Sequence, residues 1–385
     1  MSVRKRAWKS PSGELKEAWV VDYVDQHGDR HLKTFAKKRD ADAHHAIVAT
    51  AVRAGVHTAD SKSVTVARAA ELWLESCEAA GLEWATIVDY RQHADLHIAP
   101  FLGALRLSQL TVPLVRGFED RLRQAGRSQA MVRKVRRSLG GILADAQERR
   151  LVAQNVVYSL RRRSHSRRAE GTGKLKVGID IPAPAEMRAI VGKLSGRYRA
   201  LLLTAIFTGL RASELRGLRW VDIDLKRGEL HVRQRADRYG KIGRPKSAAG
   251  ERTVPLPPMV IAALREHQLA SRRSELGLAF PNIRGGIEHL NSIVKRGLVP
   301  AMIAAGVVSK DGKAKYTGLH SLRHFYASWC INRRVDGGLE LPLKLVQTRL
   351  GHASIQMTAD TYGHLFPRGD DGSELAAAER AFLTG

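Results

Sequence analysis

The sequence predicts a multidomain chain: a small N-terminal β-sheet plus a helix, then an all-α helical domain, then a mixed α+β domain that is mainly α. Three observations support this prediction. The chain has 385 residues, and a single hydrophobic core seldom grows beyond about 250 to 300 residues. Hydrophobic residues make up 44% and charged residues 26% of the chain, which is a globular balance. The hydrophobic periodicity changes along the chain from strand-like to helical and then to mixed.

The first segment, residues 1–60, combines strand-like and helical patterns. Ala18–Val24 and His31–Phe35 flank a turn-like Gln-His-Gly-Asp sequence, which is typical of a β-hairpin. An Ala-rich helical pattern follows from Ala41 to Ala54. We expect a very small sheet with one helix and little core of its own. Its many basic residues leave two interpretations open, a solvated leader or a minor nucleic-acid contact module.

Residues 63–163 have helical periodicity throughout, and we expect helices at about 65–80, 84–98, 112–125 and 128–149. The fourth helix combines an apolar stripe with a dense set of basic residues. Few acidic residues lie between these bases, so phosphate contact is favoured over a merely solvated surface. The candidate DNA-binding residues here are Arg127, Arg133, Lys134, Arg136 and Arg137.

Residues 164–176 are predicted to form an exposed basic linker. The stretch from Arg161 to Arg168 holds five arginines and no acidic residue, and glycines follow it, so it cannot build a core. A basic strap between two basic domains suits a clamp that closes around a duplex. It makes Arg161, Arg162 and Arg163 candidate DNA contacts as well. A flexible tether explains the glycines equally well.

Residues 177–368 show a mixture of helical and strand-like patterns. The expected helices are at about 184–194, 197–208, 211–217, 258–275, 286–304, 319–331, 343–350 and 354–361. The expected strands are at 221–225, 229–235 and 252–256. Residues 369–385 then carry a helical tail pattern.

The charge balance points to an extended polyanionic partner such as nucleic acid. Sixty-four Lys and Arg stand against 38 Asp and Glu, a net charge of +26. No apolar run approaches the roughly 18 residues of a membrane span, and the N-terminus lacks a signal-peptide core. We therefore expect a cytoplasmic, nucleoid-associated protein without a membrane partner. Cys77 and Cys330 lie far apart in apolar contexts, which predicts core cysteines rather than a disulfide or a zinc site.

Two basic residues of the last domain have phosphate-binding contexts. Arg211 follows Gly209 at the start of a helix, where backbone N–H groups and a guanidinium together suit a phosphate. A surface ion pair with Glu214 or Asp222 is the alternative. Lys246 lies in a polar connection before an apolar strand, where its ammonium can neutralise phosphate charge or protonate a leaving oxygen, although most such lysines are solvated.

Two further motifs supply the remaining candidate residues. His320 and Arg323 are three residues apart, so their side chains share one helix face. An imidazole and a guanidinium side by side suit a pentacoordinate phosphorane. The alternative is a structural His and a surface Arg. In the string from Leu350 to His364, Gly351 can end one helix with a positive φ and Ser354 can cap the next. This delivers Tyr362 just past a helix. The alternative is a buried tyrosine whose hydroxyl is satisfied locally.

Metal and nucleotide cofactors find no support in the sequence. His320, His324, His352 and His364 are candidate zinc ligands, yet no Glu lies inside the His-x-x-x-His spacing. No compact group of Asp and Glu suits two-metal nuclease chemistry. The chain also lacks a G-x-x-x-x-G-K-[ST] loop and a G-x-G-x-x-G turn after a strand. We expect neither a metal nor any other cofactor.

Taken together, six residues resemble the active-site series of the tyrosine recombinase (phage integrase) family: Arg211, Lys246, His320, Arg323, His352 and Tyr362. The motifs are Thr-Gly-Leu-Arg-x-Ser-Glu-Leu, His-x-Leu-Arg-His and Leu-Gly-His, with Tyr-Gly-His ten residues after that His. The Lys segment is the most variable part of the family, and Lys241 is the nearest competitor of Lys246. The resemblance covers about residues 64 to 367.

The resemblance implies a three-domain integrase. Residues 1–60 would be a small arm-type DNA-binding domain, residues 63–163 a helical core-binding (SAM-like) domain, and residues 177–368 a catalytic domain of the tyrosine recombinase type. Residues 369–385 form a C-terminal helical tail that would dock on a neighbouring subunit. Folding back on its own subunit fits the tail pattern almost as well.

The resemblance also implies a metal- and ATP-independent enzyme that cleaves and rejoins DNA strands through a 3′-phosphotyrosyl intermediate. Arg211 and Arg323 would hold the non-bridging oxygens of the scissile phosphate, and His352 would add a hydrogen bond. His320 would assist proton removal from Tyr362, and Lys246 would protonate the departing 5′ oxygen.

Integration of a phage or mobile element, with excision as a second direction, is the implied function. The implied partners are double-stranded DNA attachment sites, a homotetramer on that DNA, an accessory directionality factor and a host DNA-bending protein. A Xer-type chromosome resolvase is the alternative within the same chemistry, and the extra N-terminal segment counts against it. A type IB topoisomerase would act as a monomer. A non-catalytic DNA-binding architectural protein would not need the six residues.

Overall fold

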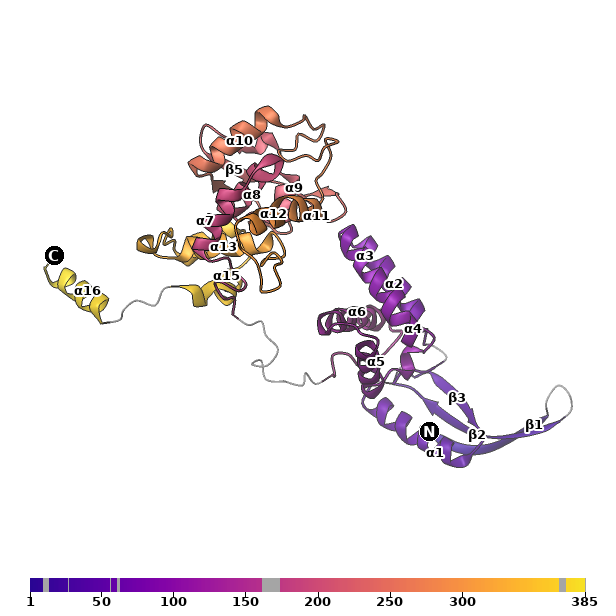
Figure 1. The fold of residues 1–385 in the computed structure, drawn as a ribbon. Helices are drawn as coiled ribbons and strands as arrows, with labels where there is room; N and C mark the ends of the chain where they lie inside the picture. The colour runs from indigo at the N-terminus through magenta and orange to yellow at the C-terminus, as the bar shows by residue number, and fades with distance from the viewer. Residues whose placement is uncertain are drawn as a thin grey trace. The chain divides into compact units, whose positions relative to one another are not determined.

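The computed structural model describes residues 1–9, 14–26, 28–55, 57–60, 63–160, 174–366 and 372–384. The chain forms two compact units, Met1–Ser164 and His165–Gly385 (Figure 1). Within the described residues, no helix has both the length and the apolar character needed to cross a bilayer. The predicted DNA contacts Arg161, Arg162 and Arg163, and the predicted linker up to residue 173, lie outside the described residues.

The first unit begins with a three-stranded antiparallel sheet in the order β1-β2-β3. Its strands are β1 (Ser2–Lys9), β2 (Leu15–Val24) and β3 (Arg30–Phe35), and helix α1 (Lys38–Arg53) follows them. The sequence predicts only the β2–β3 hairpin, because nearly every side chain of β1 is exposed and its pattern is basic rather than apolar. Ala41 and Val48 of α1 pack on Val21 and Tyr23 of β2, which makes the small core that was expected.

The rest of the first unit is a helical bundle. Its elements are α2 (Val66–Ala79), α3 (Trp84–His93), η1 (Ala94–Ile98), α4 (Ala99–Leu102), η2 (Leu107–Gln109), α5 (Val112–Gln124) and α6 (Gln129–Glu148). The second predicted helix therefore continues through the π-helical segment η1 into α4 and does not stop before Pro100. Proline lacks an amide hydrogen, so it is tolerated in the first turn of a new helical segment, which is where Pro100 lies.

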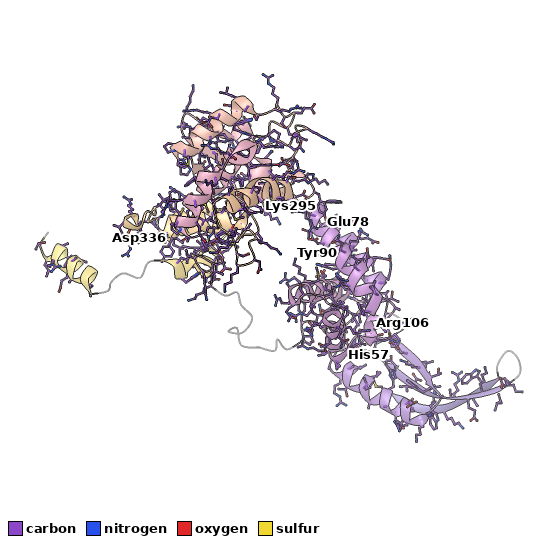
Figure 2. All side chains as sticks on the ribbon, in the orientation of Figure 1. His57, Glu78, Tyr90, Arg106, Lys295 and Asp336 are labelled. Atoms are coloured by element: carbon purple, nitrogen blue, oxygen red, sulfur yellow. The ribbon has the colours of Figure 1, made fainter. Side chains whose placement is uncertain are left out.

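Residues 57–60 join the sheet to the bundle within this unit. The Asp60 carboxylate accepts hydrogen bonds from Lys33 of β3 and from Ser108 of η2, each at 2.6 Å. Arg106 donates to the carbonyls of Asp60 and Ser63. The predicted boundary between residues 60 and 63 thus falls where hydrogen bonds connect the sheet to the helical bundle. Figure 2 labels His57 and Arg106 in this region.

The second unit is mainly helical. Its α-helices are α7 (Pro184–Lys193), α8 (Arg199–Thr208), α9 (Ala212–Gly217), α10 (Pro258–Ala270), α11 (Leu290–Ile293), α12 (Val299–Ala304), α13 (His320–Ile331), α14 (Leu343–Leu350), α15 (Ile355–Tyr362) and α16 (Ser373–Thr384). Its 3-10 and π segments are η3 (Gly196–Tyr198), η4 (Trp220–Asp222), η5 (Ala248–Gly250), η6 (Val294–Leu298), η7 (Arg334–Asp336) and η8 (Gly363–Leu365).

Short strands complete this unit. A three-stranded antiparallel sheet has the order β4-β5-β8, with β4 (Ile223–Asp224), β5 (Glu229–Val232) and β8 (Arg252–Pro255). A separate hairpin pairs β6 (Arg235–Ala236) with β7 (Ile242–Gly243). The sequence pattern predicts one strand over 229–235, whereas the chain leaves the sheet after Val232 to form this hairpin.

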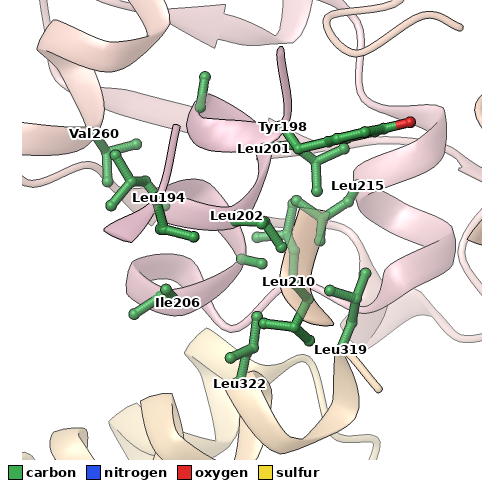
Figure 3. Packing of buried hydrophobic residues seen from close by; sticks show 14 of the residues in the cluster. Leu194, Tyr198, Leu201, Leu202, Ile206, Leu210, Leu215, Val260, Leu319 and Leu322 are labelled. Atoms are coloured by element: carbon green, nitrogen blue, oxygen red, sulfur yellow. The ribbon is translucent and has the colours of Figure 1, made fainter. Parts of the chain in front are cut away.

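Helix α8 is the centre of the core in the second unit. Its sequence is apolar on all sides, so it must be surrounded by other elements. Leu201, Leu202 and Ile206 pack against residues of neighbouring segments that include Leu215 and Leu322 (Figure 3). This packing fixes the C-terminal end of α8 beside α13. Both cysteines, Cys77 and Cys330, are free and buried, as predicted.

Candidate active site

Arg211 is held at a sharp corner between α8 and α9. Gly209 ends α8 with a φ of +63°, and a Cβ there would lie 2.3 Å from a ring carbon of Tyr326, so only glycine fits. The backbone N–H of Arg211 donates to Glu214 at 2.8 Å, and its Nη1 donates to the same carboxylate at 2.8 Å. The ion pair with Glu214 therefore forms, but Glu214 is only 2% exposed and does not lie on the surface.

Arg323 reaches the same corner from α13. Its guanidinium is buried, and it donates through Nη1 to the carbonyl of Gly209 at 2.7 Å and through Nη2 to the carbonyl of Leu350 at 2.6 Å. These carbonyls lie at the ends of α8 and α14, where a cation is favoured. Burial and the neighbouring charge of Arg211 lower the pKa of Arg323 to about 9.

Three guanidinium groups gather around one carboxylate at this corner. Arg252 of β8 donates to Glu214 at 2.9 and 3.2 Å and to the carbonyl of Arg349 at 2.7 Å. Arg323 has no ion pair with any carboxylate in the part of the chain that the structure describes. Burial raises the pKa of Glu214, but the hydrogen bonds and charges of Arg252 and Arg211 outweigh it and keep that pKa below its usual value. The corner thus has an excess of buried positive charge, which an anion would neutralise.

The segment that carries the tyrosine follows α14. Gly351 ends α14 with a φ of +63°, and a Cβ there would lie 2.8 Å from Nη1 of Arg252. The Ser354 hydroxyl caps α15 by accepting from the amide of Met357 at 3.3 Å. Both local predictions are confirmed. Tyr362 is the last residue of α15 rather than a residue beyond it, and Gly363 caps the helix. The Tyr362 side chain is only 1% exposed.

The Tyr362 phenol lies among imidazoles. Its oxygen is 2.8 Å from Nδ1 of His324, and its ring stacks on that of His352 with centroids 6.3 Å apart. Burial raises the pKa of Tyr362 to about 12, while the charges of Arg323 and Arg211 oppose that rise. The ring of His320 meets the ring of His324 edge-on at 4.5 Å. Among the described residues, His324 rather than His320 is the histidine hydrogen-bonded to the phenol.

Electrostatics keep these histidines neutral. Burial, followed by nearby positive charges, lowers the pKa of both His324 and His352 to about 4. Nδ1 of His352 is 2.9 Å from the hydroxyl of Thr358. The side chain of His320 is accessible to solvent, and the surrounding protein and the charges of Arg323 and Arg211 lower the pKa of its ring as well.

We expect the second unit to lose stability as the pH falls from about 6.5 toward 4. In this window the unfolded chain takes up protons on His324 and His352 while the folded chain does not, so acid favours unfolding. The loss should be on the order of 1 to 2 kcal/mol for each histidine by about pH 5. Thermal melts at pH 7 and pH 5 should show a smaller decrease for His352→Asn than for the wild-type chain. Equal decreases would contradict the assignment.

Lys246 is not part of this cluster. It is exposed in the bend between β7 and η5, and no hydrogen bond or ion pair within the described residues connects it to the arginines or the tyrosine. Lys241, the competing residue, is also exposed, directly before β7. The structure therefore brings together Arg211, His320, Arg323, His352 and Tyr362 and leaves Lys246 outside.

The predicted DNA-binding residues of the first unit lie on and before α6. Arg133, Lys134 and Arg137 are exposed on α6, and Arg127 is exposed just before it. Arg136 differs, because its guanidinium donates at 3.1 Å to Glu119, a carboxylate of α5 that is 2% exposed. Arg136 thus connects α5 to α6.

Three residues of the site, His324, Glu214 and Arg252, are not among the six active-site candidates that the sequence predicts. His324 belongs to the His-x-Leu-Arg-His string, and its position four residues after His320 was the available signal. For Glu214, the sequence predicts only a surface ion pair with Arg211. Arg252 has no local signal, because its partners Glu214 and Arg349 are far from it in the chain.

Comparisons with known proteins show which proteins this chain resembles. Residues 183–368 match the phage integrase family. The chain is 27% identical to a tyrosine recombinase XerC-like protein of Caldanaerobacter subterraneus, over 89% of this chain and 90% of that protein. It is 26% identical to the integrase of Mycobacterium phage D29, over 69% of this chain and 72% of that protein.

Solved structures show the same multidomain fold. The Tn1549 transposon integrase in complex with a circular intermediate DNA superposes with a TM-score of 0.63 at 19% identity, covering 83% of this chain and 100% of that one. A λ integrase tetramer bound to a Holliday junction gives a TM-score of 0.55 at 16% identity, covering 90% of this chain and 95% of that one. Residues 183–368, which include every member of the cluster from Arg211 to Tyr362, thus belong to the phage integrase family of DNA strand-exchange enzymes.

Proposed function

We propose that this recombinase integrates a phage or mobile element, with excision as a second direction, through a 3′-phosphotyrosyl bond to Tyr362. One observation carries the proposal: Arg211 and Arg252 bond to the carboxylate of Glu214, while the buried guanidinium of Arg323 beside them bonds only to two carbonyls, close to a buried phenol. A DNA phosphodiester supplies the missing negative charge, and its phosphorus is the electrophile that a phenol can attack.

Each residue then has a proposed role. Arg211 and Arg323 hold the non-bridging oxygens, and Arg323 is already fixed in orientation by two carbonyls. His352 has Nδ1 against Thr358, which leaves Nε2 to donate to the phosphorane. Lys246 protonates the 5′ oxygen after the bend that carries it closes on the DNA. His320 assists proton removal through its edge-on contact with His324.

The remaining parts of the chain bind DNA and other subunits in this proposal. Residues 1–60 act as an arm-type domain, residues 63–163 as the core-binding domain, 164–176 as the linker and 177–368 as the catalytic domain. Exposed Arg133, Lys134 and Arg137 of α6 contact phosphates. Four subunits assemble on paired attachment sites in the cytoplasm at the nucleoid, with a directionality factor and a DNA-bending protein as further partners.

The C-terminal helix α16 is the proposed contact between subunits. Leu375, Phe382 and Leu383 on α16 are 71%, 86% and 73% exposed. Apolar side chains so exposed favour burial against another surface, and a neighbouring subunit of the tetramer supplies one.

A chromosome resolvase is the second candidate function. A relative named XerC-like aligns over 89% of this chain, which favours it. The DNA recovered from covalent adducts distinguishes the two functions, because a resolvase acts at one chromosomal site and an integrase joins an element end to its target.

Adduct trapping tests the proposed function. The wild-type chain is incubated in EDTA with a randomised library of nicked duplexes, in which cleavage beside the nick releases a short fragment and traps the enzyme. We expect a protein–DNA band that survives denaturing electrophoresis, because the arginines offset the phosphate charge without a metal. The absence of a band, or a band that forms only after Mg²⁺ or Zn²⁺ is added, would contradict the proposal.

A further inference from the structure

We propose that His324 orients the phenol of Tyr362 and accepts its proton when the phenol attacks DNA; this inference rests on the proposed function. His324 is the residue after Arg323 on α13, and it is not one of the six residues that resemble the active-site series. Nδ1 of His324 lies 2.8 Å from the Tyr362 oxygen, which is hydrogen-bond distance for a general base.

The arrangement of the three rings singles out His324. Its ring meets the Tyr362 ring at 62°, with centroids 5.7 Å apart, so its nitrogen approaches the hydroxyl from the side. His352 lies parallel to the Tyr362 ring, at an interplanar angle of 2°, and its Nδ1 faces Thr358 instead. His320 contacts the ring of His324. Of the three, only His324 has a ring nitrogen at hydrogen-bond distance from the phenol oxygen.

The charges around His324 set the direction of that hydrogen bond. His320 and Arg323 of α13 and burial itself disfavour a protonated ring, whereas Asp180 favours one, and the net pKa of His324 is about 4. The ring is therefore neutral at pH 7. The pKa of the facing Tyr362 phenol is about 12, so that phenol is protonated. The phenol O–H consequently donates to Nδ1 of His324, and Nε2 carries the ring hydrogen.

The chemical step balances with this assignment. The Tyr362 oxygen forms a bond to phosphorus, the bond from phosphorus to the 5′ oxygen breaks, and the phenol proton passes to Nδ1 of His324. The 5′ oxygen takes its proton from a different group, assigned above to Lys246. Religation runs the same transfers backwards, so His324 returns its proton to the phenol.

Two substitutions separate orientation from proton transfer. His324→Asn places an amide oxygen close to the position of Nδ1, so it can accept the hydrogen bond but cannot take up a proton. His324→Ala removes both capacities. Single-turnover cleavage is measured from pH 6 to 9 on a nicked duplex that carries the sequence recovered in wild-type adducts. DNA binding by each variant is measured on the same duplex, so that loss of folding is not mistaken for loss of chemistry.

The expected result is a change in the pH profile as well as in the rate. The wild-type rate should vary little from pH 6 to 9, because the ring is already neutral. The Asn variant should cleave about 100-fold more slowly at pH 7 and gain about tenfold per pH unit, because attack then waits for ionised phenol. The Ala variant should be slower than the Asn variant at every pH. His324→Gln serves as the second neutral variant if the Asn variant does not bind DNA.

A matched control shows whether loss of any histidine of this unit has the same effect. His267 of α10 is partly buried, with Nε2 2.9 Å from the carbonyl of Ala279, and His267→Gln preserves that contact. Its rate and profile should match those of the wild-type chain. A His324→Asn profile that runs parallel to the wild-type profile, or a variant that cleaves faster, would overturn the inference while leaving the proposed function intact. A wild-type chain that forms no adduct would overturn both.

Discussion

Tyr362→Phe is expected to reduce covalent adduct formation below detection while half-site DNA binding stays within about twofold of wild type. The substitution removes the nucleophilic oxygen and nothing else. The Phe ring fills the same buried position and stacks on His352 in the same way. The lost hydrogen bond to His324 costs about 1 kcal/mol of stability. Denaturing electrophoresis after incubation with nicked site DNA measures the adduct.

Tyr316→Phe is the matched control for that experiment. Tyr316 is also buried, at 4% exposure, and its hydroxyl donates to Glu186 at 2.6 Å in the same unit. It lies outside the cluster of arginines and histidines, so the variant should still form the adduct. An adduct from Tyr362→Phe at the wild-type rate would mean that another residue attacks the DNA.

Glu214→Gln should give the largest loss of stability. The carboxylate accepts hydrogen bonds from both Arg211 and Arg252, and without its charge three neighbouring guanidiniums repel one another. Breaking a buried ion pair from one side costs on the order of 3 to 5 kcal/mol, or roughly 10 °C in melting temperature for a unit of this size. DNA cleavage should fall as well, because Arg211 loses the partner that orients it. Calorimetry and single-turnover cleavage measure the two effects.

Glu266→Gln provides the comparison with an exposed ion pair. Glu266 of α10 pairs with Arg199 at 3.0 Å, but its side chain is 72% exposed. Such pairs contribute about 0 to 1 kcal/mol, so this variant should melt close to the wild-type temperature. If Glu214→Gln melted there too, the carboxylate would not be what holds the arginines together.

The sequence predicts most of the helices and the local geometry of the site for one reason: both depend on near neighbours in the chain. Gly209 and Gly351 end their helices with positive φ, a backbone conformation that glycine adopts without strain. The spacing of His320 and Arg323 on one helix follows from 3.6 residues per turn.

What the sequence cannot supply is set by packing between distant segments. The rotation of α13 against α15 decides that His324 and not His320 meets the phenol. Arg252 and Glu214 pair across 38 positions. Likewise, the basic pattern of α6 does not reveal that Arg136 is bound to Glu119 of α5. Each of these contacts requires the tertiary fold.

Identification of the residue that is joined to DNA tests the central claim most directly. Trypsin releases the site segment from Leu350 to Arg368, in which Tyr362 is the only tyrosine. After nuclease digestion of the trapped adduct, fragmentation of this peptide in a mass spectrometer should place a nucleotide phosphate on Tyr362. A nucleotide on Ser354 or Thr358, or on a peptide from any other part of the chain, would contradict the account.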